Sequence, residues 1–483
     1  MSSQRKVLSN TLAQFIGKFL TVVASLVIVK IITNIGTEFY GSYLTTYEFL
    51  AFFGIIADAG LFAIAVREMS KQPQKSEFIL ANIFSMRLLL IFGVMLLAGV
   101  SAQFVPSYSP EVKLGIWITA LSMGLTIIAG TLSSILQARM KIQYFSGSLV
   151  LGKIFLAAII FVTYLKAGFT GNLDSVLGTG VFFAMLWAGV ISNVIFTGLV
   201  AYFAGREIPI RLGFDFSWWK KIFNISLPYG LALILQTLYL RVDIIIISIL
   251  LGATSVGIYG VSTRVLESLL ILGVFFGQAI LPRLSAEENN HYKIQKTLKW
   301  GIEILLICSL PLIIGISKFA PQIIKILSSK EFLSTPEFFG SDKALLVLIP
   351  TIFFAYFNQL FTFTLIAKNR QKYLLLVNGI ALSINAILNI ILIPKFGIIA
   401  AAISTILCEI VVFGLLTKEI LLHYNIRSLW SKNLWIIIFA NVILGIEIYL
   451  TPLSEKFTLA AVIGSLTYFG ILWSHRHKFL PKN

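Results

Sequence analysis

The chain has 483 residues, of which 58% are hydrophobic and only 12% are charged, and its mean hydropathy is +0.91. Apolar stretches of about twenty residues recur along its length, which excludes a soluble protein and predicts an all-α polytopic membrane protein. The formal net charge of +17 is what basic cytoplasmic loops produce in a membrane protein, so no nucleic-acid partner is expected.

Catalytic and metal-binding motifs are absent from the sequence. It contains no HExxH, no Walker loop and no CxxC, so nothing indicates ATP hydrolysis or zinc chemistry. The two cysteines, Cys308 and Cys408, both lie in apolar stretches and offer neither a disulfide framework nor a metal site. We therefore expect no enzyme activity and no cofactor. Because Met1–Asn10 is short and polar, with no cleavage site after it, we expect the first helix to be retained.

The hydrophobic runs predict fourteen transmembrane helices. In chain order they lie near 9–33, 41–66, 78–102, 114–137, 145–165, 177–203, 222–250, 256–281, 299–317, 344–366, 374–394, 397–418, 433–450 and 457–474.

The distribution of lysine and arginine gives the orientation. With both termini in the cytoplasm, the cytoplasmic segments hold 24 of the 38 Lys and Arg residues and the opposite loops hold 8. This bias follows the positive-inside rule. It predicts a multi-pass protein of the cell inner (plasma) membrane with cytoplasmic N- and C-termini.

Two pairs of similar segments indicate an internal repeat. "ARMKIQY" (138–144) resembles "AKNRQKY" (367–373), and "NIGTEFYGSY" (34–43) resembles "LLGATSVGIYGVS" (251–263), in matching order. Because the repeat covers six helices, both halves have the same membrane orientation, which suits alternating access at their interface. The predicted organisation is an N-terminal lobe (1–204), an amphipathic cytoplasmic linker (205–221), a C-terminal lobe (222–420), and a terminal helix pair with a basic tail (421–483).

Polar residues form matching faces on the first and seventh predicted helices. Residues at i, i+4, i+11 and i+15 share a helix face. The first helix places Lys18 among polar side chains, and the seventh places Arg241 on the equivalent face. Small polar residues can simply help helices pack, but cations on both faces predict two walls of one cavity. The residues are Asn10, Gln14, Lys18, Thr21 and Ser25 on the first helix, and Ser226, Gly230, Thr237 and Arg241 on the seventh.

Arg241 and Asp243 stand two positions apart in "LYLRVDIIIISIL". They are about 200° apart around a regular helix, so they cannot pair with each other there. We expect Arg241 to face the substrate cavity and Asp243 to face the interior of the second lobe, where it would couple ions.

For the other intramembrane charges, the sequence is compatible with more than one role or partner. Arg87 and Lys153 are predicted to face the cavity, although Arg87 could instead extend toward the cytoplasmic surface. Arg264 is a further cavity candidate, or it pairs with Glu267 at i+3. Either Glu48 or Asp58 could balance Lys18.

A second polar group lies in the eleventh and twelfth predicted helices. Asn385 and Asn389 share a face with Asn378, and Thr405 and Glu409 follow in the next helix beside Ser404. Such residues either hold helices together or, with Asp243, supply oxygen ligands or a titrating carboxylate for a coupling ion, H⁺ or Na⁺.

These motifs resemble those of polysaccharide (O-antigen-type) flippases, in the superfamily that also contains multidrug and toxin extrusion (MATE) transporters and lipid II flippases. The resemblance rests on residues 226–265, with Pro228, Asp243, Leu251–Gly252 and the Gly-x-Tyr at 257–259, and on "NAILNIILIPKFGIIAAAIST" (385–405). It implies a V-shaped pair of helical lobes that carries an undecaprenyl-pyrophosphate-linked oligosaccharide to the outer leaflet by ion-coupled alternating access.

The resemblance also implies a site for the coupling ion. Some lipid II flippases have a sodium site whose matching positions here are Asp243, Asn385, Asn389 and Thr405. This chain has Asn389 where those proteins have an acid, so a proton at Asp243 is the alternative. Implied partners are the lipid-linked oligosaccharide, membrane lipids, and a polysaccharide polymerase with chain-length proteins.

Three other functions are compatible with parts of the pattern. A cation-coupled multidrug exporter of the same superfamily should have acidic rather than basic cavity residues, and a lipid II flippase shares the fold. A membrane-bound oligosaccharide polymerase or ligase usually carries a large external loop, which is missing here.

Overall fold

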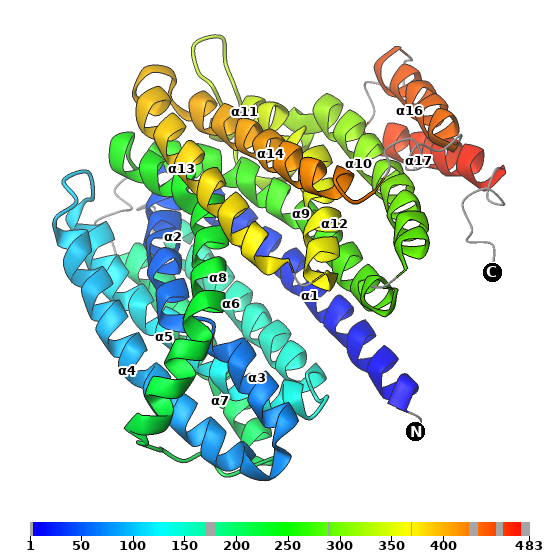
Figure 1. The fold of residues 1–483 in the computed structure, drawn as a ribbon. Coiled ribbons are helices and arrows are strands. Elements are labelled where there is room, and N and C mark those ends of the chain that lie inside the picture. Colours follow the sequence, from blue (N-terminus) through cyan, green and yellow to red (C-terminus); the bar gives the residue numbers. More distant parts are fainter. Residues whose placement is uncertain are drawn as a thin grey trace. The chain divides into compact units, whose positions relative to one another are not determined.

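The computed structural model describes residues 3–169, 180–287, 290–368, 370–424, 433–450 and 457–474, with α-helices and short 3₁₀ turns as their regular structure (Figure 1). Two compact units can be distinguished. Unit 1 comprises residues 1–260 with 327–329, and unit 2 comprises residues 261–326 with 330–483. The boundary between the units, at residues 260 and 261, falls inside helix α9. The division into lobes at the linker 205–221 is a separate prediction from the sequence.

Unit 1 is built from eight helices and the start of a ninth. Helix α5 packs against α2, α3, α4 and α7, and α1 packs against α6. The helices are α1 (Ser3–Thr33), α2 (Thr37–Asp58), α3 (Leu61–Lys71), α4 (Ser76–Gln103), α5 (Pro110–Ala138), α6 (Gln143–Phe169), α7 (Gly180–Gly205), α8 (Phe216–Leu250) and the first residues of α9 (Ala253–Ala286).

The second predicted helix, 41–66, is not continuous. Helix α2 ends at Asp58, and Ala59 and Gly60 both take left-handed backbone conformations (φ 44° and 72°) before α3 begins at Leu61. A left-handed residue followed by glycine is a common helix end. The hydrophobic run continues through this break, so composition gave one span, 41–66, and did not reveal the interruption.

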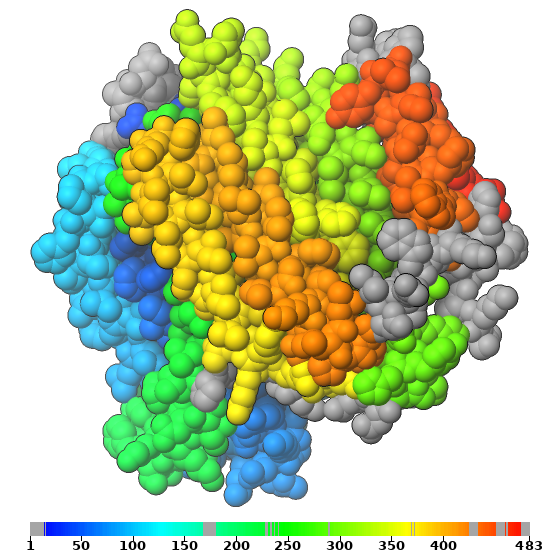
Figure 2. Space-filling view, turned by 45° about the horizontal axis from the view of Figure 1, so that its top comes forward, coloured from blue at the N-terminus to red at the C-terminus, as the bar shows by residue number. Residues whose placement is uncertain are grey.

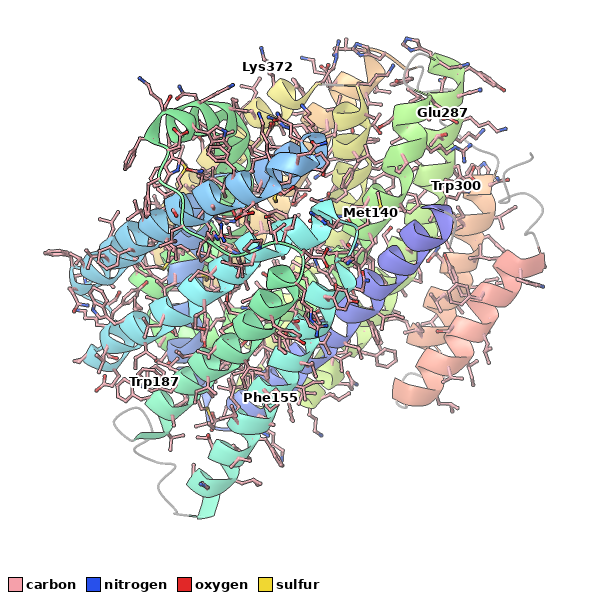
Figure 3. The ribbon with its side chains drawn as sticks, turned by 90° about the horizontal axis from the view of Figure 1, so that it is seen from below. Met140, Phe155, Trp187, Glu287, Trp300 and Lys372 are labelled. Carbon is pink, nitrogen blue, oxygen red and sulfur yellow. The ribbon has the colours of Figure 1, made fainter. Side chains whose placement is uncertain are left out.

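The helices of unit 1 are apolar on their outer faces and carry polar groups inside. On α4, Asn82, Ser85 and Arg87 are buried, while Phe92 is 72% exposed. Phe155 on α6 and Trp187 on α7 are likewise exposed (Figure 3). This arrangement fits a hydrocarbon surrounding, in which buried positions are the only ones where polar groups find partners.

The segment between α7 and α8 is fixed to α4. The amide oxygen of Asn82 accepts hydrogen bonds from Asp215 N (2.8 Å) and Trp219 Nε1 (3.0 Å), and Ser85 Oγ accepts one from Gly213 N (3.0 Å). Asp215 also caps α8 by accepting from Trp218 N (2.9 Å). Helix α8 therefore starts inside the predicted linker, at a point set by these bonds.

Unit 2 contains the remainder of α9 and the helices after it. Helix α14 packs against α11, α12 and α13, and α16 packs against α17. In the space-filling view α13 and α14 run side by side across the visible face of this unit (Figure 2). The helices are α10 (His291–Leu327), α11 (Ser341–Leu348), α12 (Thr351–Ala367), α13 (Gln371–Phe396), α14 (Ile398–Leu421), α16 (Asn433–Leu450) and α17 (Phe457–Ser474).

The tenth predicted helix, 344–366, is also broken. Helices α11 and α12 meet at Ile349–Pro350 with a bend of 43°. Proline lacks an amide hydrogen and clashes with the preceding helical turn, which explains the bend at this position. The span predicted at 344–366 thus corresponds to the α11–α12 pair, and the bend within it was not part of the prediction.

Eleven of the described helical segments are long and apolar enough to cross a membrane, or twelve if the bent α11–α12 pair counts as one crossing. The other two predicted ranges correspond to α8 and α17. The chain is thus a multi-pass helical membrane protein, and the exact number of fourteen crossings stays a prediction.

Candidate functional site

Helix α8 runs antiparallel to α2, and glycines allow the close approach. A Cβ added at Gly230 would lie 2.5 Å from the carbonyl oxygen of Ala59, and one added at Gly257 would lie 2.3 Å from that of Thr37. These contacts lie at opposite ends of α2. We call the surface where α2 meets α8 and the first residues of α9, within unit 1, the α2–α8 seam.

An ion pair lies in the middle of the seam. Arg241 Nη1 on α8 donates to Glu48 Oε2 on α2. The Glu48 side chain is almost fully buried, whereas 28% of the Arg241 side chain is exposed. Arg241 is therefore the more accessible member of the pair, and Glu48 holds it in place. The position of Arg241 in a substrate cavity stays a prediction.

Asp243 has a different partner from Arg241. Its carboxylate accepts hydrogen bonds from Tyr259 Oη at 2.6 Å and from Ile244 N at 2.8 Å, and it is 6% exposed. The tyrosine lies on the first turns of α9, so Asp243 fixes the α8–α9 hairpin. The two charges thus have separate surroundings, in line with the helical geometry expected from the sequence.

The other predicted cavity residues of unit 1 lie on α1 and α6. Gln14 and Lys18 on α1 are exposed, and Lys153 on α6 is partly buried. Helices α1 and α6 pack against each other. The side chain of Asn10 lies outside the described residues. Whether these positions line one cavity with Arg241 stays a prediction.

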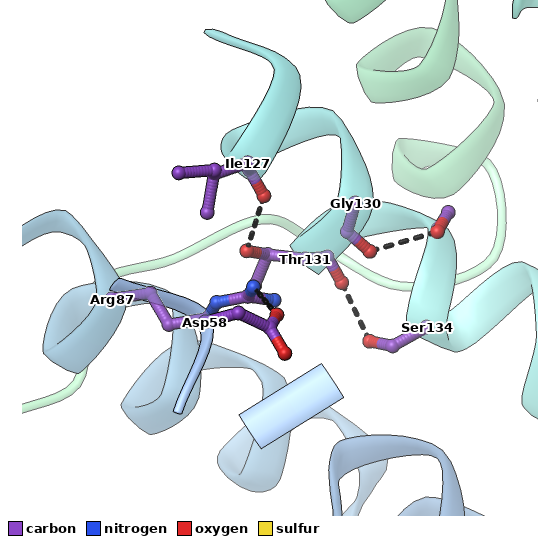
Figure 4. Close-up of polar contacts among 7 residues, drawn as sticks. Asp58, Arg87, Ile127, Gly130, Thr131 and Ser134 are labelled. Atoms are coloured by element: carbon purple, nitrogen blue, oxygen red, sulfur yellow. Dashed lines mark hydrogen bonds and ion pairs between the residues drawn. The ribbon is translucent and has the colours of Figure 1, made fainter. Parts of the chain in front are cut away.

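Arg87 is enclosed in unit 1. Its side chain is only 3% exposed, and Nη2 donates to Asp58, the last residue of α2 (Figure 4). Nε and Nη1 have no hydrogen-bond partner among the described residues. Thr131 Oγ1, nearby in Figure 4, bonds instead to the carbonyl of Ile127 at 2.9 Å. Arg87 thus supports the α2–α3 break from inside unit 1, and its predicted contact with substrate stays a prediction.

Glu48 and Asp58 therefore each balance an arginine. The sequence left open which of them balances Lys18, and the structure pairs Glu48 with Arg241 and Asp58 with Arg87.

In unit 2, Arg264 pairs with Glu267 on the same helix at 2.9 Å. This is the local pair that the i,i+3 spacing allowed. The Arg264 side chain remains 30% exposed, so its predicted contact with substrate stays a prediction.

The predicted ion-coupling residues of α13 and α14 lie in unit 2, where Asn385, Asn389 and Glu409 are buried and Thr405 is partly buried. Asn389 Nδ2 donates to Asn385 Oδ1 within α13, and Thr405 donates to the carbonyl of Ala401 at 3.0 Å. Glu409 accepts from Asn358 Nδ2 on α12 at 2.6 Å. Unpartnered buried oxygens remain on Asn358, Asn389 and Ser404 among the described residues, so this cluster retains acceptors for a cation or a proton donor.

The predicted ion-coupling residues are divided between the units. Asp243 belongs to unit 1, and Asn385, Asn389, Thr405 and Glu409 belong to unit 2. The predicted sodium ligands thus come from both units, and the sodium site that they would form stays a prediction.

The repeated motif at 138–144 and 367–373 makes equivalent contacts in both units. Lys141 in the first copy pairs with Glu207 at 2.7 Å, just after α7. Arg370, at the same position of the second copy, pairs with Glu419 near the end of α14. In each half, a cation after the fourth helix of the repeat thus binds a glutamate at the end of the sixth. These matching pairs support the internal repeat.

Three residues with clear roles were not among the candidate site residues. They are Glu48, Tyr259 and Asn358, which bind Arg241, Asp243 and Glu409. Tyr259 is part of the Gly-x-Tyr motif, and Glu48 is an acid inside an apolar run, so both carried a signal. Asn358 had none, because a single buried amide is common in membrane helices.

Comparison with known proteins agrees with this architecture. The sequence model of the family described as "Polysaccharide biosynthesis protein" matches residues 35–336. The probable low-salt glycan biosynthesis flippase Agl15 of Haloferax volcanii is 24% identical over 406 residues, covering 82% of this chain and 80% of that protein. An uncharacterized membrane protein of Methanocaldococcus jannaschii, MJ1068, is 24% identical over 434 residues, 87% of this chain and 78% of its own length.

Two solved structures share the fold. The lipid II flippase MurJ in an inward closed conformation aligns with a TM-score of 0.75 at 16% identity, covering 97% of this chain and 99% of that one. An inward-facing multidrug resistance MATE transporter aligns with a TM-score of 0.64 at 15% identity, covering 83% and 95%. The chain therefore has the same helical fold as these two proteins.

Proposed function

The chain belongs to the polysaccharide biosynthesis protein family, and on that premise we propose that it is a flippase for a lipid-linked oligosaccharide. The substrate we propose is an undecaprenyl-pyrophosphate-linked repeat unit, carried from the cytoplasmic to the outer leaflet for O-antigen, capsule or exopolysaccharide synthesis. Support comes from the family and from the flippase of Haloferax volcanii. The named relatives with a stated activity are flippases and transporters, not enzymes.

The observation that carries this proposal is the Arg241–Glu48 pair. An arginine inside the membrane costs several kcal/mol, so such residues are usually functional. Arg241 is the more exposed partner, 28% against 7%. A guanidinium presents several N–H donors in a plane and binds phosphate oxygens in pairs. Arg241 is thus suited to the diphosphate of a polyprenyl-linked sugar and unsuited to a cationic drug.

Glu48 gives Arg241 a partner while no substrate is bound. A diphosphate carries more negative charge than one carboxylate, so it can replace Glu48 at the guanidinium. The carboxylate would then be left without that partner inside the α2–α8 seam, which disfavours the closed seam. Substrate binding and separation of α2 from α8 would be linked in this way.

Ion coupling is a further part of the proposal. Asp243 with Tyr259, and Glu409 with Asn358, are the buried carboxylates that we expect to bind H⁺, or Na⁺ together with Asn385, Asn389 and Thr405. Their burial supports this assignment, because a charged carboxylate in the membrane requires protonation or a counter-ion.

The proposed setting is the cell inner membrane with both termini in the cytoplasm. A polysaccharide polymerase and chain-length proteins would act on the delivered unit at the outer surface. These proposals rest on the charge bias of the loops and on the chemistry of the proposed substrate.

The function is tested by replacing Arg241 or Lys18 with alanine and measuring surface polysaccharide in intact cells. We expect loss of polysaccharide at normal protein abundance. Arg283→Gln serves as the control, because Arg283 lies in a pair four residues apart at the end of α9 and belongs to no proposed site. Wild-type polysaccharide in both alanine variants would refute the cavity assignment. If deletion of the gene left surface glycans unchanged but altered the resistance of the cells to cationic dyes, the protein would instead be a drug exporter.

A further inference from the structure

A polar cavity lies in unit 2, and none of the predicted substrate-binding or ion-coupling residues lines it. Its volume is about 230 Å³. It is bounded by the end of α12, the start of α13, the end of α14 and the start of α10. The charged residues, histidines and tyrosine that line it are His291, Lys368, Arg370, Glu419, His423 and Tyr424. A buried water needs about 30 Å³, so the cavity can hold a tetrahedral oxyanion with several waters.

The lining carries more positive than negative charge. Arg370 is paired with Glu419, the single carboxylate among the lining residues. Lys368 adds another positive charge, and His291 and His423 add two imidazoles. Helix α13 begins at Gln371 without a side-chain cap, so its first amide groups add a partial positive charge at this end. The site therefore favours an anion.

Tyr424 provides the independent observation. It is 5% exposed, and its hydroxyl has no hydrogen-bond partner among the described residues. Buried hydroxyls nearly always have partners. Burial raises the pKa of Tyr424 above its usual value, so the hydroxyl stays protonated and can donate. A donor without an acceptor beside a cationic cavity indicates an acceptor that binds there.

The first copy of the repeat shows that the ion pair does not require this site. Lys141 pairs with Glu207, as Arg370 pairs with Glu419. The second copy adds His423 and Tyr424 directly after its final helix, and His291 from α10. Because the pair forms in both copies, these additional residues serve another purpose.

We propose that this cavity is a binding site for a phosphate group, supplied either by free inorganic phosphate or by the phosphomonoester head group of an anionic lipid. Lys368 provides charge and Tyr424 donates one hydrogen bond. Arg370 bridges Glu419 and the phosphate, since a guanidinium has donors for both. The site is separate from Arg241, so it would not be the transported diphosphate's own contact.

The test uses the purified full-length protein in lipid nanodiscs. One arm titrates inorganic phosphate, by isothermal calorimetry, against protein in phosphatidylcholine nanodiscs. The other arm places the protein in nanodiscs containing phosphatidate and counts retained lipids by native mass spectrometry. The variants are Tyr424→Phe and Lys368→Gln, and Lys141→Gln is the matched control from the first repeat. Thermal unfolding without ligand checks that each variant is folded.

We expect one bound phosphate or one retained phosphatidate per chain. Tyr424→Phe should weaken binding about tenfold, the usual effect of losing a hydrogen bond to a charged group. Lys368→Gln should weaken it at least as much, and Lys141→Gln should bind like the wild type. Binding in the first arm identifies the free anion as ligand, and binding in the second arm alone identifies the lipid.

Two results would overturn the proposal. One is the absence of specific binding in both arms. The other is wild-type affinity in both Tyr424→Phe and Lys368→Gln, which would place any bound phosphate elsewhere. Neither result bears on flippase activity, because the test measures binding without transport.

Discussion

Arg241 and Asp243 lie two positions apart on α8 and bind Glu48 and Tyr259 from other helices. Arg87 and Glu409 are likewise held by residues distant in sequence, Asp58 and Asn358. Each buried charge thereby connects two helices. In hydrocarbon a charge without such a contact costs several kcal/mol, so removing one partner should affect both the stability of the protein and the arrangement of the helices.

Glu48→Gln tests the central pair. The substitution keeps the shape of the side chain but leaves Arg241 without this carboxylate, so we expect a loss of about 2 kcal/mol in stability, reduced because Arg241 is partly exposed. The loss of stability is measured by heating the protein in detergent and recording the decrease of its monodisperse peak in size-exclusion chromatography. Glu267→Gln, in an exposed pair, is the matched control and should cost about 0.5 kcal/mol. Restoration by the exchange Glu48→Arg with Arg241→Glu would show that pairing is responsible, and equal effects of both single changes would contradict it.

Tyr108, between α4 and α5, gives a pH-dependent prediction. Its hydroxyl is within 2.7 Å of Ser248 Oγ, and burial raises its pKa from 10.0 to about 12. A raised pKa favours the protonated form in the folded state. The stabilising effect of the protonated Tyr108 hydroxyl is therefore complete below pH 10 and is lost as the pH rises toward 12. Unfolding midpoints of wild type and Tyr108→Phe should converge over that range, and parallel curves would refute the assignment.

At the scale of helices, the breaks within helices and the close crossings between them constrain movement more than helix length does. Helix α2 stops at Asp58, and α11 and α12 meet at a bend of 43°. At the other extreme, α2 and α9 approach so closely that only glycine fits at residues 41 and 257. These features determine which helices can move apart without deforming their backbones.

Gly257→Ala should open the α2–α8 seam. The added methyl group would meet the carbonyl oxygen of Thr37, a backbone atom that cannot rotate away, so the helices must separate. A cysteine pair at Ser107, in the α4–α5 connection, and Ser248 on α8 reports the resulting displacement of α8 within unit 1, because the Ser107 hydroxyl donates to the backbone carbonyl of Ser248 at 3.3 Å. Displacement should reduce the disulfide yield in a variant lacking Cys308 and Cys408. Gly93→Ala, with open space around it, should leave the yield unchanged, and the same yield in Gly257→Ala would contradict the prediction.

For the molecule as a whole, the charge bias predicts the orientation in the membrane. It predicts cytoplasmic termini and an external α4–α5 connection. A single cysteine at Ser107 should react with an impermeant maleimide in intact cells, whereas one at Gln74, between α3 and α4, should react only after permeabilisation. Both positions are exposed in the structure. Reaction of Gln74→Cys in intact cells would reverse the proposed topology.

The amino-acid sequence by itself determined the membrane class and the approximate ranges of most helices, and it predicted an internal repeat that the Lys141–Glu207 and Arg370–Glu419 pairs support. These depend on hydrophobicity and local spacing, which are properties of contiguous segments. It also determined that Arg241 and Asp243 belong to different surroundings, because helical periodicity separates neighbouring side chains.

Only the tertiary structure decided the partners and the breaks. That Glu48 binds Arg241, and Asp58 binds Arg87, depends on which helices meet. The interruption at Ala59–Gly60 depends on two backbone conformations inside a continuous apolar run. The cavity beside Tyr424 arises where four helix ends converge. Each of these results from contacts between segments distant in the chain, and hydrophobic patterning constrains only the faces that are buried.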